Sequence, residues 1–278
     1  MKELYELGIV RHAEPFFPRT RDRADIAVLK DEAGVIFLNS TDHMDLAHYQ
    51  GLSIAETWGA KERTEALAAT RDDDTRRAAY VSALRPKRYI DVGCGLGGTM
   101  ELLVGEIPEI HGVEPQADIL ALLKSRFTMY TSIDDVSGQF DVASLFHVFE
   151  HLTEPMAMLK KVHERLVPGG RVIIEVPHAR DALLALDAFK AFSLWSEHLV
   201  LHTRQSLAIY LEKAGFHTIE IKGVQRYPLA NHLRWLVEGL PGGQKTLSQY
   251  ADPTLAAAYE AYLVAHDSTD TLLAIAQK

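Results

Sequence analysis

From residue 87 onward, short apolar segments alternate with longer segments of helical character, and this alternation constrains the fold more than any other feature. Apolar strands that alternate with helices indicate a largely parallel sheet covered on both faces. We therefore expect a Rossmann-like α/β domain over residues 87–278, with a seven-stranded, mostly parallel sheet and helices on both faces. The predicted strands are residues 88–92, 110–114, 127–131, 140–145, 171–176, 217–223 and 270–276, and the clearest predicted helices are residues 117–125, 154–166, 203–214 and 253–266.

The segment before this alternation, residues 1–86, is expected to form an N-terminal extension. Its apolar runs 25–30 and 34–38 predict a β-hairpin, and residues 73–84 predict a helix with three aspartates at its positive N-terminal end. No linker rich in Ser, Gly or Pro follows, so the extension should pack against the remainder of the chain. His43, His48 and Tyr49 belong either to a lid over a substrate or to an irregular surface loop.

One predicted strand, residues 88–92, runs directly into a loop with glycines at positions 93, 95 and 97. Glycine permits a tight turn and lets a ligand approach the backbone closely. The third glycine comes one residue earlier than in a dinucleotide-binding G-x-G-x-x-G loop. Asp91 stands just before the loop, where it would repel a pyrophosphate but suits a ligand that carries a cationic amino-acid group. A tight strand–helix turn without a ligand is the alternative interpretation.

Charge and composition exclude several classes of function. The chain has 29 basic and 38 acidic residues, a net charge of −9, so we expect no nucleic acid partner. No apolar run approaches the roughly 20 residues that span a bilayer, and residues 1–6 lack the features of a signal peptide. Cys94 has no second cysteine to pair with, which fits a reducing, cytoplasmic location. A homo-oligomer is compatible with the sequence.

The segment 91–97, DVGCGLG, resembles the first motif of class I S-adenosylmethionine-dependent methyltransferases. Glu114, which closes the second predicted strand, matches the family acid that holds the ribose hydroxyls, and segments 140–143 and 166–172 resemble two further motifs. The resemblance covers about residues 75–225 and implies an antiparallel last strand beside the sixth. The resemblance also implies that Asp134, just after the third predicted strand, lies in the adenine pocket; the alternative is that it caps a turn together with Asp135. The cofactor-binding residues expected from the resemblance are Asp91, Gly93, Cys94, Gly95, Gly97, Glu114, Pro115, Asp134 and Phe146.

A histidine-rich segment follows the fourth predicted strand. If a helical turn begins there, His147, Glu150 and His151 share one face, because they are spaced i, i+3 and i+4. One interpretation is general-base catalysis by His151 first and His147 second, supported by Glu150. Another is a divalent metal bound by His147, Glu150, His151 and His198. A third is that His151 only satisfies a buried backbone group.

The metal interpretation follows a second resemblance. The segment is similar to small-RNA terminal 2′-O-methyltransferases and ubiquinone-pathway O-methyltransferases, which carry two acids three residues apart followed by histidine. Here His147 replaces the first acid, which argues against magnesium in particular.

The part of the chain after residue 194 indicates which kind of molecule accepts the methyl group. Segments 195–216 and 225–236 resemble methyltransferases of sugar and polysaccharide biosynthesis, which implies a sugar or glycan acceptor. Arg226 or Arg234 could pair with a phosphate or acidic sugar. Alternatively, the insert near residues 224–268 begins with a helix that docks on the sheet through Leu229, Leu233 and Leu236. The substrate-binding residues expected here are His178, His198, Tyr227, Asn231 and Arg234.

Three functions stay open from the sequence. The first is an S-adenosylmethionine-dependent O-methyltransferase of a sugar, sugar nucleotide or glycan. C-methylation is less favoured, because the extension lacks the cysteine cluster of zinc-containing sugar C-methyltransferases. The second is an O-methyltransferase of another small molecule or of an RNA end, although the charge of −9 argues against RNA. The third is a catalytically silent partner subunit, against which the intact loop and Glu114 argue.

Overall fold

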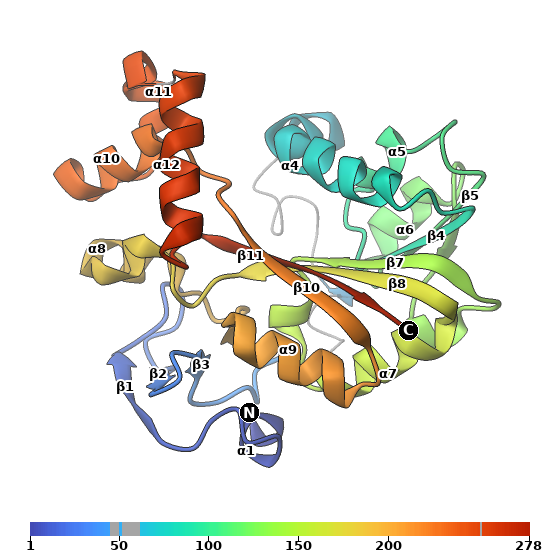
Figure 1. Ribbon diagram of the computed structural model, residues 1–278, viewed down its shortest axis with the longest axis horizontal. Coiled ribbons are helices and arrows are strands. Elements are labelled where there is room, and N and C mark those ends of the chain that lie inside the picture. The colour runs from blue at the N-terminus through green and yellow to red at the C-terminus, as the bar shows by residue number, and fades with distance from the viewer. Residues whose placement is uncertain (45–49, 52–61, 251) are drawn as a thin grey trace.

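A seven-stranded sheet in the order β10-β11-β8-β7-β4-β5-β6 forms the centre of the fold (Figure 1). The computed structural model describes residues 1–44, 50–51, 62–250 and 252–278. Five neighbouring strands are parallel, while β11 lies antiparallel between β8 and β10. This confirms the predicted sheet and its last strand. The strands are β4 (Arg88–Val92), β5 (Glu109–Val113), β6 (Thr128–Tyr130), β7 (Phe140–Phe146), β8 (Leu166–Pro177), β10 (His217–Val224) and β11 (Thr271–Gln277).

Helices cover both faces of this sheet (Figure 1). On one face lie α4 (Arg63–Ala83), α5 (Gly98–Leu102) and α6 (Ala117–Leu123), and on the other lie α7 (Pro155–Arg165) and α9 (Arg204–Lys213). The central strands are buried on both sides, which explains why their sequences are almost continuously apolar. None of the helices in the described residues combines the length and apolarity needed to cross a membrane.

The N-terminal extension adds a second, four-stranded sheet. β2 (Val28–Asp31) and β3 (Ile36–Leu38) form the predicted hairpin, with Val28 opposite Leu38. β3 also pairs with β9 (Val200–Leu201), so the extension is hydrogen-bonded to a distant part of the chain. Leu4 and Phe37 belong to the same apolar core as α7 and α9. The remaining elements of this part are α1 (Lys2–Glu6) and β1 (Ala13–Phe17).

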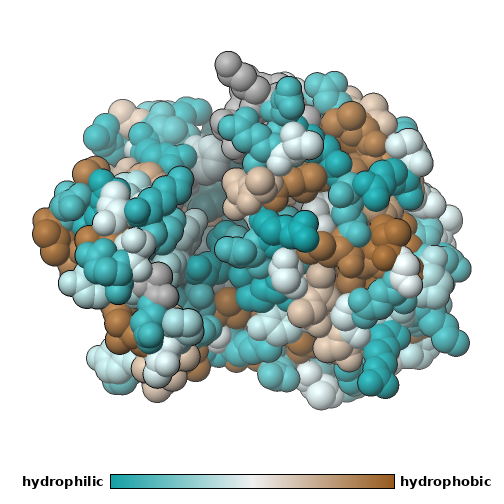
Figure 2. All heavy atoms as spheres, turned by 90° about the horizontal axis from the view of Figure 1, so that it is seen from above, coloured by the Kyte–Doolittle hydropathy of each residue, from teal (hydrophilic) through white to brown (hydrophobic). Residues whose placement is uncertain are grey.

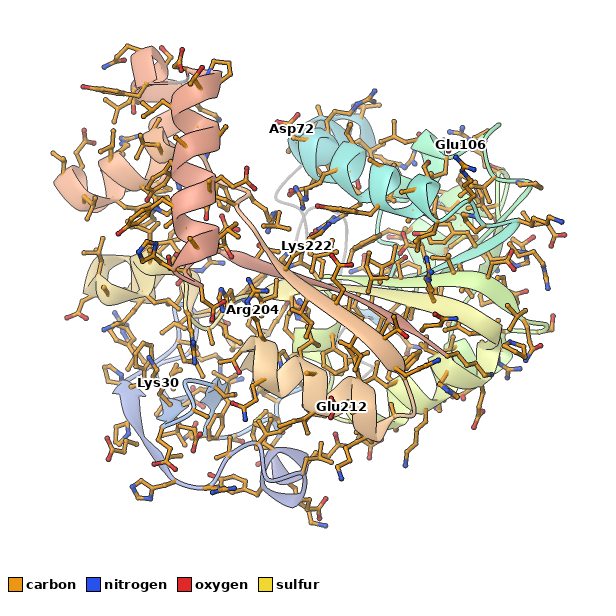
Figure 3. All side chains as sticks on the ribbon, viewed as in Figure 1. Lys30, Asp72, Glu106, Arg204, Glu212 and Lys222 are labelled. Carbon is orange, nitrogen blue, oxygen red and sulfur yellow. The ribbon has the colours of Figure 1, made fainter. Side chains whose placement is uncertain are left out.

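Helix α4 begins ten residues earlier than the sequence pattern predicted. It extends from Arg63, because no glycine or proline interrupts residues 63–83 and most of them favour helix. The three aspartates therefore lie in the middle of the helix and do not interact with its N-terminal end. Asp72 projects from α4, and Lys222 of β10 lies 4.1 Å from the Tyr80 ring on the same helix (Figure 3).

A helical arm projects from the chain between β10 and β11 (Figure 1). It contains α10 (Leu229–Glu238), α11 (Gly243–Thr246), the short turn η4 (Ser248–Tyr250) and α12 (Pro253–Ala265). Asp270 closes the base of the arm, since its carboxylate accepts the backbone N–H groups of Arg226 at 3.0 Å and Tyr227 at 3.0 Å. Near this base lie η3 (Ala182–Ala185) and α8 (Asp187–Ser193).

Candidate functional site

One cavity of about 950 Å³ lies at the carboxyl ends of the parallel strands, where the loops after β4, β5, β7 and β8 meet. In the view of Figure 2 the surface is hollowed between two parts of the molecule. One end of the cavity is formed by the glycine loop and α4, and the other by the helical arm, α8 and Arg21 of the N-terminal extension.

The glycine loop is held against β5 by its own backbone. Gly93 and Cys94 donate their N–H groups to the carbonyl oxygen of Val113, at 2.8 and 3.1 Å. Gly93 has a φ of +74°, and a Cβ atom at this position would lie 2.4 Å from Cγ2 of Val148. Glycine is thus required both for the backbone conformation and for space. Gly93, Cys94 and Gly95 line the cavity, whereas Gly97 begins α5 behind the loop.

Glu114 faces the cavity at the end of β5. Its two carboxylate oxygens accept the N–H groups of Gly95 and Gln116, each at 2.9 Å. Burial raises the pKa of Glu114, and these two hydrogen bonds oppose that effect. Each oxygen has a second lone pair, so the carboxylate can accept two further hydrogen bonds from a ligand.

Asp91 lies beneath the glycine loop with almost no solvent contact. Ser144 donates to it at 2.6 Å, and the Ser144 hydroxyl also contacts Tyr89 Oη at 2.6 Å. Burial raises the pKa of Asp91 to about 6. A cationic group in the cavity would stabilise the ionised form. Pro115 and Phe146 also line this end of the cavity.

Asp134 lies outside the cavity. Its carboxylate accepts a hydrogen bond from Lys161 at 2.8 Å, and its side chain is 62% exposed. Ser132 and Asp135 form a capping box around η1 (Ile133–Asp135), so the acidic pair serves the turn. Ser132 and Ile133 line the cavity in its place, a difference that residue type alone did not predict.

The segment after β7 does not form the predicted helical turn from His147. His147 has a left-handed backbone with φ of +53°, and the short helix η2 (Phe149–His151) begins only after it. His147 and Glu150 still meet, with Nδ1 2.9 Å from Oε1. The Nε2 atom of His147 lies 3.1 Å from Nη1 of Arg226 and 3.3 Å from Oε1 of Glu175. Burial lowers the pKa of His147, but the two carboxylates outweigh it and hold the pKa above its ordinary value.

Glu150, His151 and His198 converge on one point. Their potential ligand atoms all lie within 4.8 Å of one another, and the rings of the two histidines are 5.0 Å apart. Burial raises the pKa of Glu150, but the opposing effect of His147 is stronger, so the pKa is lowered to about 2. Burial, reinforced by His151, lowers the pKa of His198 to about 3. Oε2 of Glu150 is buried and has no hydrogen-bond partner among the described residues.

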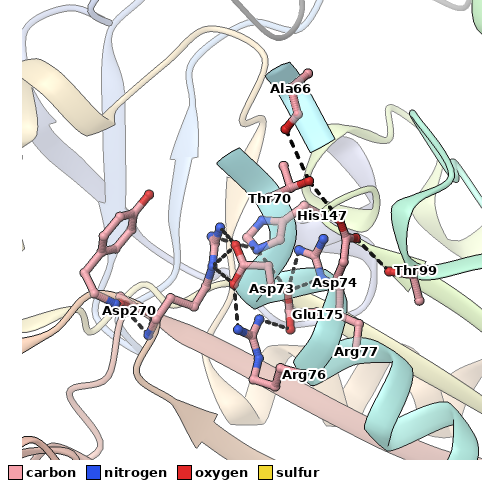
Figure 4. A network of polar contacts seen from close by, with 12 residues as sticks. Ala66, Thr70, Asp73, Asp74, Arg76, Arg77, Thr99, His147, Glu175 and Asp270 are labelled. Atoms are coloured by element: carbon pink, nitrogen blue, oxygen red, sulfur yellow. Dashed lines mark hydrogen bonds and ion pairs between the residues drawn. The ribbon is translucent and has the colours of Figure 1, made fainter. Parts of the chain in front are cut away.

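A buried ionic network lies beside this cluster (Figure 4). Glu175 of β8 has no exposed side-chain surface, and it accepts hydrogen bonds from Arg76 at 2.8 Å and from Arg77 at 2.6 and 2.8 Å. Asp73, on the same face of α4, pairs with Arg76 and Arg226. Burial raises the pKa of Glu175, but Arg77 and His147 hold it well below its ordinary value. This network was not predicted from the sequence, although a glutamate inside an apolar strand was a signal for it.

The opposite end of the cavity has an aromatic wall. Trp235 of α10 contacts Phe189 and Phe192 of α8, with ring centroids 5.1 and 5.2 Å apart. Helix α10 buries Trp235, whereas Leu229 and Leu233 are half-buried and Leu236 is 63% exposed. Trp195 also lines this end.

Some of the predicted substrate-binding residues line the cavity, and others do not. Tyr227 lines the cavity, as do Asn231, whose side chain accepts the N–H of Gly242 at 2.9 Å, and the buried His178. Arg234 pairs with Glu238 at 2.9 Å and is not among the residues that line the cavity. Arg226 lines the cavity and pairs with Asp73, which Arg76 also contacts. His43 contacts the carbonyl oxygen of Ser196 at 2.8 Å, whereas His48 and Tyr49 fall outside the described residues.

The known proteins that this chain resembles are methyltransferases. Residues 60–221, more than half of the chain, match the family model described as a methyltransferase domain. A ubiquinone biosynthesis O-methyltransferase of Pseudomonas aeruginosa is 22% identical over 152 residues, which are 49% of this chain and 64% of the relative. The chain therefore spans less than two thirds of that relative's length.

Two further similar proteins are also methyltransferases. A trans-aconitate 2-methyltransferase of Rhodopseudomonas palustris is 30% identical over 122 residues, 40% of this chain and 48% of the relative. The solved structure of an S-adenosylmethionine-dependent methyltransferase from Archaeoglobus fulgidus aligns with a TM-score of 0.52 and 18% identity. That alignment covers 81% of this chain and 98% of the other, and it shows that the two share a fold.

Glu175→Gln should lower the free energy of unfolding by about 3–5 kcal/mol, because it leaves the Arg77 guanidinium in a buried site without its carboxylate and removes one of the two carboxylates that pair with Arg76. Urea unfolding measures the effect. The matched control is Glu109→Gln, which removes an exposed ion pair with Arg88 and should cost less than about 1 kcal/mol. Equal effects of the two substitutions would contradict the stabilising role of the buried network.

Proposed function

Because this chain belongs to the methyltransferase domain family, we propose that it transfers the methyl group of S-adenosylmethionine to a hydroxyl oxygen of a small molecule. One observation carries the proposal: a single cavity joins the glycine loop and Glu114 at one end to the Glu150–His151–His198 cluster and an aromatic wall at the other. The single cysteine favours a reducing, cytoplasmic location as part of the same proposal.

The glycine-loop end fits the chemistry of S-adenosylmethionine. Glu114 has lone pairs for the two hydroxyl groups of a ribose, and Asp91 offers negative charge for the amino group of the methionine part. When bound, the cofactor supplies an activated methyl group and its own leaving group. The residues of this chain then have to position the acceptor and remove the proton of its hydroxyl.

We assign the proton transfer to His151. It lines the cavity, and histidine suits the task because its ordinary pKa lies near neutral pH. His147 is less suited to be the base, because both of its ring nitrogens already face protein groups. Glu150 contacts His147 and lies 3.8 Å from Nε2 of His151, so it supports both rings from within the core.

For the acceptor we propose a sugar, sugar nucleotide or glycan. The wall formed by Trp235, Phe189 and Phe192 provides flat apolar surfaces for sugar C–H groups, and Tyr227 and Asn231 add polar atoms close to them. The ubiquinone relative is named an O-methyltransferase and supports O-methylation, whereas neither it nor the trans-aconitate relative is named for a sugar. The proposal of a sugar acceptor therefore rests on the features of this cavity.

A divalent metal is the second candidate for activating the acceptor, because Oε2 of Glu150 is buried without a partner beside His151 and His198. One carboxylate and two imidazoles suit manganese, iron or zinc better than magnesium, which prefers oxygen ligands. Such an ion would orient the acceptor hydroxyl and make it more acidic. His147 lies outside this group of ligand atoms, unlike in the four-residue set expected from the sequence.

Glu114→Ala should weaken binding of S-adenosylmethionine by roughly 2–4 kcal/mol, since two charge-assisted hydrogen bonds are lost. Isothermal titration calorimetry measures this directly. Asp134→Ala is the matched control, because this carboxylate pairs with Lys161 outside the cavity and should leave the affinity unchanged. Unchanged affinity in a folded Glu114→Ala protein would mean that the ribose lies elsewhere.

His151→Ala should reduce kcat by about 10²-fold or more while the affinity for S-adenosylmethionine stays nearly constant, because the substitution removes the base and leaves the glycine loop intact. His217→Ala, at an exposed histidine of β10, should leave both unchanged. If a chelator abolishes turnover and manganese restores it, the metal candidate replaces the simple base. A His151→Ala protein that is less stable yet fully active would assign the residue to the core alone.

Mass spectrometry of a panel of sugar nucleotides and oligosaccharides, incubated with S-adenosylmethionine, should detect products that carry one added methyl group on a hydroxyl. Phenols and polycarboxylic acids are the comparison compounds. The aromatic wall and its neighbouring polar groups should favour the sugars. Methylation of the phenols or acids alone would retain methyl transfer and overturn the proposed acceptor.

A further inference from the structure

We propose that Arg226 is a positioning residue, which fixes the direction of the hydrogen bonds from the helical arm to Glu150 by donating to His147. Its catalytic meaning rests on the function proposed above, but the hydrogen-bond direction itself does not. The family match ends at residue 221, so Arg226 lies outside the part of the chain that the family model describes.

The guanidinium of Arg226 is held in place from two sides. Its Nε atom lies 3.0 and 3.1 Å from the two carboxylate oxygens of Asp73, and Nη2 also contacts Asp73 (Figure 4). Its backbone N–H donates to Asp270 at the base of the arm. Nη1 is thereby directed at His147, 3.1 Å from Nε2.

The chemistry of the two groups decides which of them donates. A guanidinium has only N–H donors and no acceptor, so Nε2 of His147 must accept with its lone pair. The proton of the neutral imidazole then resides on Nδ1, where it donates to Glu150 at 2.9 Å. The hydrogen bonds run in one direction, from Arg226 through His147 to Glu150.

Glu175 makes Arg226 necessary for this arrangement. Its Oε1 atom lies 3.3 Å from the same Nε2 atom of His147 and would attract a proton there. Without the guanidinium, the imidazole could donate from Nε2 to Glu175. The lone pair of Nδ1 would then face the carboxylate of Glu150, which is also an acceptor. Two acceptors would then face each other in the core. Arg226 prevents this, and so keeps the carboxylate of Glu150 directed between His147 and the candidate base His151.

The test is the tautomer of the neutral His147 ring, read from ¹⁵N spectra of the imidazole along a titration to high pH, because Glu150 and Glu175 hold its pKa above that of an ordinary histidine. The wild-type protein should show the proton on Nδ1. Arg226→Met, which has a similar length and no donor, should shift the ring toward the Nε2–H form or a mixture. Arg226→Lys, which keeps a donor, should largely restore the wild-type spectrum. Arg234→Gln is the matched control, since this arginine of the same arm pairs with Glu238 away from the cavity.

A second readout links the proposal to catalysis. Arg226→Met should lower kcat about tenfold or more while the calorimetric affinity for S-adenosylmethionine changes less than about threefold, because the glycine loop is untouched. An Nε2–H tautomer in the wild type, or an unchanged His147 spectrum in Arg226→Met, would overturn the proposal. If Arg226→Met does not fold, Asp73→Asn replaces it and should yield the mixed tautomer. Absence of cofactor binding in the wild type would count against the proposed function alone.

Discussion

Glu175 carries a charge at a position without solvent contact, and the architecture of the cavity depends on neutralising it. Transfer of an ion from water to a protein interior costs several kcal/mol unless partners are well placed. Arg76 and Arg77 supply these partners, and both project from α4. The helix therefore has to lie near the carboxyl end of β8, beside the cavity. In that position it also presents Asp73 to the base of the helical arm.

The strands and the glycine loop were predictable because their signals are local. Apolar runs and glycines at fixed positions report on the backbone within a few residues, and the bounds of β4 agree with the prediction. Glu114 belongs to the same class, since it directly follows its strand. Helix α4 was predicted too short because three adjacent aspartates resemble an N-terminal signal, while in the structure Asp73 and Asp74 have partners far along the chain.

The acid–histidine cluster illustrates the limit of local patterns. Regular helical spacing correctly brought His147 and Glu150 together, yet the contact is made through a left-handed residue and a short helix that the spacing does not encode. Arg226 was considered for an anionic substrate, but its partner is 153 residues away in sequence. Pairings between such distant residues depend on the assembled fold and leave no periodic trace in the sequence.

The place of β11 in the sheet has a consequence for biosynthesis. This strand lies between β8 and β10, but it is the last of the seven strands to leave the ribosome, after the whole helical arm. Until it is made, β8 and β10 each have an open edge with unpaired backbone groups, which can associate with other chains. The sheet can therefore close only late, and the nascent chain passes through a stage in which the largely buried strand β8 has an open edge, so that folding depends on rapid completion or on chaperones.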